Sequence, residues 1–105
     1  MTDFKRISCQ QASDLCKLEG TQIVDVREAA VYNQAHIKGA VHIDNSSLTS
    51  FVAEADQDAA LVIYCYHGNS SQQAGQFFTQ QDFTQVYSVD GGFEQWRVEL
   101  PEDLV

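Results

Sequence analysis

Cys65 is the residue in this sequence with the clearest capacity for chemistry. It follows the apolar, β-branched run "LVIY" at 61–64, and it precedes the small and polar stretch "YHGNS" at 66–70. Glycine and asparagine adopt positive φ angles most readily, so this stretch can curl and turn successive backbone N–H groups inward. Those N–H groups, with the N-terminus of a helix that starts near Ser70 or Ser71, would surround the sulfur with positive potential. A thiol in that setting ionises more easily than free cysteine and becomes a nucleophile at neutral pH.

A nucleophile of this kind needs a scaffold that holds it at the end of a strand. Short apolar runs alternate with longer stretches of helical spacing, which is the pattern of βα units around a mostly parallel sheet. In such a sheet, ligands bind beyond the carboxyl ends of the strands, where Cys65 lies. The expected fold class is α/β, a mostly parallel five-stranded sheet with helices on both faces. The expected strands lie near residues 4–7, 22–26, 40–43, 60–64 and 85–88.

Several predicted helices carry recognisable start signals. Ser8 with Gln11 three residues later has the spacing of a capping box, and Asn45 or Ser46 can cap the helix that follows it. The last helix is expected after "DGG" at 90–92, where the two glycines let the backbone turn close to the Cys65 loop. These signals place helices between the strands, as a parallel sheet requires.

Length and charge narrow the possible functions. A chain of 105 residues has material for one core, so we expect a single domain over residues 1–105. No window approaches the roughly 18 uninterrupted apolar residues of a membrane helix, and "MTDFKRISCQ" lacks the profile of a secretion signal, so we expect a cytoplasmic protein without a membrane partner. Fifteen acidic against six basic residues give a formal charge of −9, which argues against a nucleic-acid partner.

The three cysteines, Cys9, Cys16 and Cys65, are an odd number in a chain expected to stay in a reducing compartment. At least one is therefore expected to be a free thiol. A buried, inert cysteine is the plain alternative for Cys65, but a small and polar loop followed by a helix favours a reactive one. Cys9 and Cys16 fall within the first predicted helix, and we assign them no chemistry.

Three stretches together resemble one family. "CYHGNSS" at 65–71 resembles the active-site loop of rhodanese-type sulfurtransferases, particularly the single-domain thiosulfate sulfurtransferases of the GlpE type. "VDVREAAVYNQAHIKGAVHI" at 24–43 and "VYSVDGGFEQW" at 86–96 are similar to the N-terminal and C-terminal signatures of the family, in the family's order. The resemblance implies a single rhodanese domain with Cys65 as the catalytic residue. It also implies a substrate-binding loop made of Tyr66, His67, Gly68, Asn69 and Ser70.

The resemblance implies transfer of sulfane sulfur from thiosulfate to cyanide, a small thiol or a thioredoxin-like acceptor. Cys65 would attack the outer sulfur of thiosulfate, sulfite would leave, and the acceptor would take the sulfur from a cysteine persulfide. This double displacement needs no metal and no organic cofactor. The histidines share no metal-ligand spacing with the cysteines, which agrees with a site without metal.

Two departures from related patterns bear on the alternatives. Many rhodaneses carry an arginine five residues after the nucleophile, where this chain has Ser70. Phosphatases and arsenate reductases on this fold carry one six residues after it, where this chain has Ser71. Phosphoryl and arsenate groups are normally held by a guanidinium, so a loop without arginine favours sulfur transfer. A cysteine phosphatase or arsenate reductase, and a non-catalytic rhodanese-like module that binds a partner, stay as alternatives.

Asp25 and Arg27, just after the second predicted strand, are the remaining charged candidates. We interpret them as a hydrogen-bonded structural pair that anchors the "HIKGA" segment at 36–40, although either could bind substrate. Tyr66 and Phe93 could form an apolar rim or could pack in the core. Whether Arg27, Tyr66 or Phe93 contacts substrate is left open by the sequence.

Overall fold

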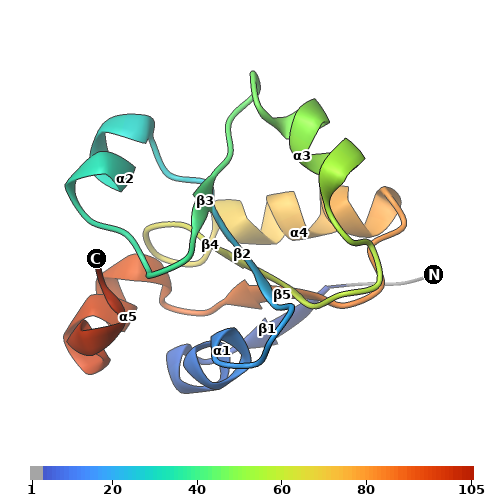
Figure 1. Cartoon of the computed structure of the whole chain (residues 1–105). Helices are drawn as coiled ribbons and strands as arrows, with labels where there is room; N and C mark the ends of the chain where they lie inside the picture. Colours follow the sequence, from blue (N-terminus) through green and yellow to red (C-terminus); the bar gives the residue numbers. More distant parts are fainter. Residues whose placement is uncertain (1–3) are drawn as a thin grey trace.

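One parallel sheet organises the computed structural model, which describes residues 4–105 (Figure 1). Its five strands lie in the order β1-β5-β4-β2-β3, and every pair of neighbours is parallel. All four residues of the central strand are buried, as expected for an apolar run covered on both faces. The α/β class and the five strand positions predicted from the sequence are confirmed, with bounds that differ by at most one residue. The strands are β1 Lys5–Ile7, β2 Gln22–Asp25, β3 Val41–His42, β4 Leu61–Tyr64 and β5 Val86–Val89.

Helices cover both faces of this sheet (Figure 1). Val62 and Tyr64 of β4 face a core that includes Trp96, whereas Leu61 and Ile63 face a second core that includes Phe78. This alternation follows from the two-residue repeat of a strand. Helices α1 and α5 pack on the first face, and α3 and α4 on the second. The helices are α1 Cys9–Cys16, α2 Ala29–Gln34, α3 Leu48–Glu54, α4 Ser70–Gln80 and α5 Gly92–Glu99, followed by a 3-10 turn at Pro101–Asp103.

The structure confirms the predicted start signal of α1 and contradicts that of α3. The capping box of α1 is confirmed, because the Gln11 N–H donates to the Ser8 hydroxyl and the Ser8 N–H donates to the Gln11 side chain. The expected cap of α3 by Asn45 or Ser46 is wrong. Ser47 is the residue that precedes α3, and it makes no side-chain cap. Instead the Asp44 carboxylate accepts from the backbone of Ser46 and Ser47 in an Asx-type turn, which replaces the cap.

The sheet brings Cys65 to the end of its central strand. β4 ends at Tyr64 and α4 begins at Ser70, so residues 65–69 form a short loop beyond the carboxyl edge of the sheet (Figure 1). Within residues 4–105, every helix is too short or too polar to cross a membrane.

Candidate active site

The Cys65 sulfur lies inside the curl of the 65–69 loop and is almost fully buried, with 5% of the residue exposed. The backbone N–H of Gly68 donates to the sulfur at 3.1 Å, and that of Ser71 donates at 3.3 Å. The curl depends on Gly68, whose φ of +97° is one that side-chain-bearing residues rarely adopt. The donors therefore converge on one atom, the arrangement that binds negative charge.

The surroundings of the sulfur favour its ionised form. Burial alone would raise the pKa of Cys65, but the Ser71 hydroxyl and the backbone N–H groups of Ser71, Gly68 and His67 outweigh it and lower that pKa. The other two thiols differ. Burial, with Glu99 and Asp90 nearby, raises the pKa of Cys9 to about 11, and burial with Asp103 nearby raises the pKa of Cys16 to about 12. Cys65 is thus the cysteine whose surroundings suit a nucleophile.

A hollow of about 350 Å³ opens at Cys65 and forms the mouth of the candidate site. The structure places four of the five loop residues predicted to bind substrate around this mouth, and the fifth, Gly68, is buried and donates its N–H to the sulfur. The sequence had already marked Arg27 as a residue that could bind substrate, but it gave no sign of Val26 and Glu28, which follow β2 and reach the mouth only through the fold. The residues that line the mouth are Val26, Arg27, Glu28, Cys65, Tyr66, His67, Asn69 and Ser70.

Ser71 is a second residue whose role the sequence did not reveal. Its hydroxyl lies 3.5 Å from the Cys65 sulfur and 2.8 Å from the hydroxyl of Ser88 on β5. Both serines are fully buried. When the sulfur is ionised, Ser71 can donate to it while Ser88 donates to Ser71, so the pair extends the set of donors by a hydroxyl held in place. The sequence signal that could have indicated this role is a small residue with a hydroxyl on the first turn of the helix after the loop.

We expect Ser71→Ala to make Cys65 a weaker nucleophile. The substitution removes the hydroxyl donor but leaves the backbone N–H, so the pKa of the thiol should rise. The loss of one hydrogen bond to a charged group should raise this pKa enough to slow the alkylation of Cys65 by iodoacetamide about tenfold at neutral pH. The pH profile of that rate provides the measurement. Ser70→Ala is the matched control, because Ser70 is exposed and forms no hydrogen bond with the sulfur. Identical profiles for the two variants would remove Ser71 from the thiolate site.

The N-terminus of α5 fixes the loop from the other side. The Phe93 N–H donates to the Cys65 carbonyl at 2.7 Å, and the Glu94 N–H donates to the Tyr66 carbonyl at 3.1 Å. This approach requires Gly92, because a Cβ there would lie 2.4 Å from the Tyr66 oxygen and 2.6 Å from the Cys65 oxygen. The expectation that the two glycines bring the backbone close to the Cys65 loop is therefore confirmed.

Arg27 is a buried structural residue whose charge is already paired. Its guanidinium donates to the Asp25 carboxylate at 2.6 Å and to the Ala35 carbonyl at 2.7 Å, which ties the end of β2 to the segment before "HIKGA". The same guanidinium lies 3.9 Å from the centre of the Phe93 ring, and 2% of the Arg27 side chain is exposed. This geometry agrees with the interpretation of a structural pair. Phe93 packs under Arg27 and does not line the mouth.

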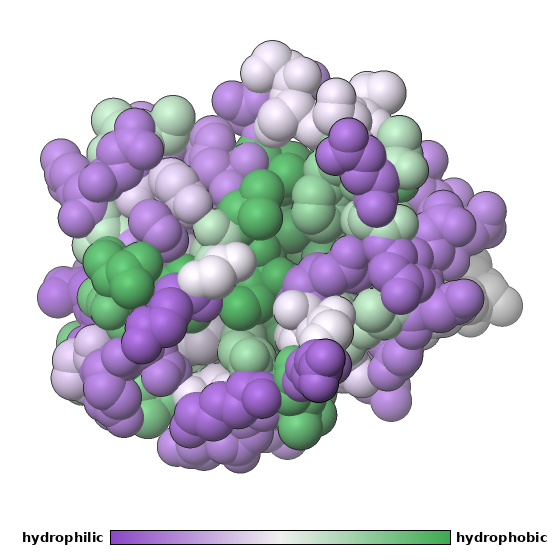
Figure 2. Space-filling view, viewed as in Figure 1, coloured by the Kyte–Doolittle hydropathy of each residue, from purple (hydrophilic) through white to green (hydrophobic). Residues whose placement is uncertain are grey.

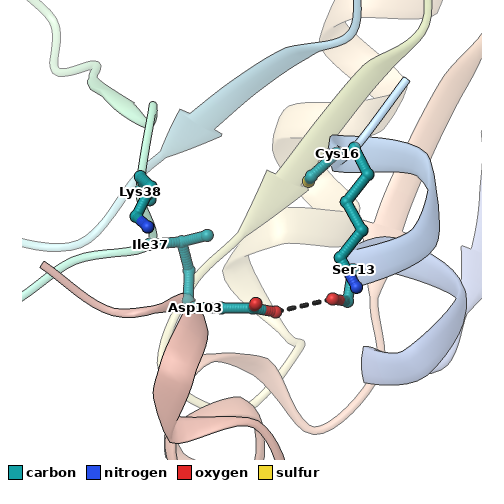
Figure 3. Close-up of a pocket in the computed structure, with 6 residues that line it drawn as sticks. Ser13, Cys16, Ile37, Lys38 and Asp103 are labelled. Atoms are coloured by element: carbon teal, nitrogen blue, oxygen red, sulfur yellow. Dashed lines mark hydrogen bonds between the residues drawn. The ribbon is translucent and has the colours of Figure 1, made fainter. Parts of the chain in front are cut away.

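A separate hollow of about 180 Å³ holds the Cys16 thiol (Figure 3). The Asp103 carboxylate on its wall accepts from the Ser13 hydroxyl at 2.6 Å and from the Trp96 indole at 2.9 Å. Because the pKa of Cys16 is raised to about 12, its thiol stays protonated at neutral pH. We therefore still assign no chemistry to Cys16. Across residues 4–105, His, Cys, Asp and Glu side chains form no group of three or more that could hold a metal ion.

Comparisons with known proteins agree with this fold. The Rhodanese-like domain family matches residues 8–99. The thiosulfate sulfurtransferase GlpE of Pseudomonas savastanoi pv. phaseolicola is 50% identical over 105 residues, which cover 100% of this chain and 98% of the relative. The enzyme of the same name from Pseudomonas paraeruginosa is 53% identical over 100 residues, 95% of this chain and 90% of the relative.

Solved structures place the same fold in more distant proteins. A rhodanese-related protein from Thermoplasma volcanium has a TM-score of 0.78 at 26% identity, and the match covers 92% of this chain and 94% of that one. The reduced CoADR-RHD of Bacillus anthracis has a TM-score of 0.82 at 26% identity, and the match covers 97% of this chain but 18% of that longer one. Together with the family match over most of the sequence, these likenesses show that the chain belongs to the Rhodanese-like domain family.

Proposed function

We propose that this chain is a thiosulfate sulfurtransferase that carries sulfane sulfur on Cys65. The observation that carries the proposal is a sulfur atom held by converging N–H and hydroxyl donors at the end of the central strand. The names of relatives at about half identity, over essentially the whole chain, support thiosulfate as the donor. The chain acts as a single domain over residues 1–105, in the cytoplasm, where a reducing environment keeps Cys65 as a free thiol.

The reaction divides into two sulfur transfers. The Cys65 thiolate attacks the outer sulfur of thiosulfate, the sulfur–sulfur bond of thiosulfate breaks, and sulfite leaves with the electron pair. A small thiol, cyanide or a thioredoxin-like protein then takes the outer sulfur, and the Cys65 thiolate is regenerated. The N–H groups of Gly68 and Ser71 stabilise the negative charge on the sulfur in both steps, as an oxyanion hole does for oxygen. The chemistry uses no metal and no organic cofactor.

The rival activities fit the mouth less well. A phosphatase or arsenate reductase needs a guanidinium free to hold a tetrahedral oxyanion. In the described chain, Arg27 is the single Lys or Arg residue that lines the mouth, and it is bound to Asp25. A non-catalytic module would have no need for a cysteine whose pKa is lowered by aligned donors.

Incubation with thiosulfate tests the proposal directly. Intact mass should increase by one sulfur atom, and peptide mapping should place that atom on Cys65. Initial rates with a thiol acceptor should give parallel lines in double-reciprocal plots, because sulfite leaves before the acceptor reacts. Intersecting lines would indicate a ternary complex and would contradict a free persulfide intermediate.

Ser70→Arg should strengthen thiosulfate binding. Thiosulfate is a dianion, and the mouth of this acidic protein contains Glu28 but no unpaired arginine or lysine among its described residues. A partly exposed charge-assisted contact is worth about 1 kcal/mol, so KM at low salt should fall roughly fivefold. The sulfite end is held before and during transfer, so kcat should change little.

Gln73→Arg is the matched control for this prediction. Gln73 lies on the same first turn of α4, is exposed, and does not line the mouth. Gln73→Arg therefore makes the same change of charge near the N-terminus of α4. The gain for Ser70→Arg should shrink at high ionic strength. Equal KM values for the two variants at low salt would mean that position 70 does not face the anion.

A further inference from the structure

A hollow with apolar walls adjoins the mouth of the active site and has no part in the reaction described so far. Its volume is about 230 Å³. Figure 2 shows hydrophobic side chains gathered in the depression at the centre of this face, below α3. The walls come from the ends of β2 and β3, the first turn of α3 and one side of α4. We call it the apolar hollow, and its apolar residues are Val26, Ile43, Leu48, Ala74, Phe77 and Phe78.

The apolar hollow adjoins the mouth at Cys65. Val26 lines both of them. A third depression of about 350 Å³ lies along the ends of β2 and β3, and it shares Arg27 and Glu28 with the mouth and Ile43 and Asp44 with the apolar hollow. The three depressions therefore lie next to one another beyond the ends of the strands, and together we call them the groove.

The charges along this groove are unfavourable for an anion. Glu28 and Asp44 are exposed carboxylates on its rim. Arg27 is bound to Asp25, so its charge does not compensate them. Hydrogen bonds from the hydroxyl and N–H of Ser46 lower the pKa of Asp44, which keeps that carboxylate ionised at neutral pH. A ligand that extends from the mouth into the apolar hollow should therefore carry an apolar chain with no negative charge on that chain.

We propose that the apolar hollow binds the carbon chain of an uncharged, low-molecular-weight acceptor thiol during the second half-reaction. This inference rests on the proposed function, because it needs a persulfide on Cys65. The acceptor thiolate forms a bond to the outer sulfur of the persulfide, and the bond from that sulfur to the Cys65 sulfur breaks. The electron pair of the broken bond returns to Cys65 as a thiolate, and the acceptor leaves as its own persulfide.

A series of matched acceptors tests this inference. Protein loaded with thiosulfate is separated from excess donor and mixed with 2-mercaptoethanol, 6-mercaptohexanol or 6-mercaptohexanoate, and the loss of the persulfide is followed by intact mass. At equal thiolate concentration, 6-mercaptohexanol should react on the order of tenfold faster than 2-mercaptoethanol, because its four further methylene groups become partly buried in the apolar hollow. The anionic 6-mercaptohexanoate should react several-fold more slowly than 6-mercaptohexanol, by a margin that narrows with salt.

A pair of variants tests whether the preference for the longer neutral thiol arises in the apolar hollow. Leu48→Asp places a charge in the apolar hollow at the first position of α3, where an acidic residue is compatible with the helix. Thr49→Asp adds the same charge at the next residue, which is exposed and does not line the hollow. The ratio of the 6-mercaptohexanol rate to the 2-mercaptoethanol rate should fall towards one in Leu48→Asp and stay high in Thr49→Asp. Because it is a ratio within one loaded protein, incomplete loading does not change it. An unfolded persulfide would react with both thiols alike, so both variants are compared under conditions where their circular dichroism matches that of the wild type.

The outcomes separate this inference from the proposed function. If thiosulfate adds no sulfur to the wild-type protein, the proposed function fails. If the persulfide forms but short and long neutral thiols react equally, the apolar hollow does not bind the acceptor. If sedimentation shows a wild-type dimer that Leu48→Asp converts to a monomer, the hollow is an interface between copies and the inference is overturned.

Discussion

We expect Cys65→Ser to abolish sulfur transfer from thiosulfate while the protein stays folded. A serine hydroxyl is nearly isosteric with the thiol and can keep hydrogen bonds to Gly68 and Ser71, but it is a poor nucleophile at neutral pH. The variant should release no sulfite above the uncatalysed rate and should gain no sulfur atom by intact mass. Circular dichroism and the denaturant midpoint should stay close to those of the wild type.

Cys9→Ser and Cys16→Ser serve as controls for this assignment. Both residues keep high pKa values, and the Cys9 thiol only donates to the Asp90 and Gly92 carbonyls, which a hydroxyl can also do. Both variants should therefore load with sulfur and turn over as the wild type does. Persulfide on either residue, or turnover by Cys65→Ser, would show that the nucleophile is another group.

The parts of the site that local spacing encodes could be predicted from the sequence. The run at 61–64 is buried on both faces, and its end places Cys65 beyond the sheet. Asp25 and Arg27 are two residues apart, so their pairing is a local event. The box of Ser8 and Gln11 depends on a spacing of three residues. In each case neighbours in the chain decide the contact.

Contacts between distant elements could not be predicted in the same way. Ser71 meets Ser88 only because α4 packs on β5, and the apolar hollow forms only where the ends of β2 and β3 meet α3 and α4. The wrong cap of α3 is a different case. Asp44, Asn45 and Ser46 all compete for the same backbone donors, and the path of the loop decides in favour of Asp44.

Gly92→Ala should destabilise the fold and disable the site together. The φ of Gly92 is +60°, and an alanine Cβ would lie 2.4 Å from the Tyr66 carbonyl oxygen, an atom of the backbone that cannot rotate away. The left-handed conformation alone costs an alanine roughly 1 kcal/mol. Relief of the clash requires the loop and α5 to separate, which weakens the hydrogen bonds from Phe93 and Glu94. We expect a total loss of about 3 kcal/mol in the free energy of unfolding.

Gly20→Ala separates backbone strain from the clash. Gly20 has a φ of +89°, and a Cβ there would meet nothing within 4 Å, so this variant should lose only the roughly 1 kcal/mol of backbone strain and keep its activity. In folded Gly92→Ala, at a temperature well below its transition, alkylation of Cys65 by iodoacetamide should slow as well, because the loop that carries the Gly68 and Ser71 donors has moved. Equal losses of stability in the two variants would show that α5 does not hold the Cys65 loop. In that case the donors around the sulfur would be set by the loop and α4 alone.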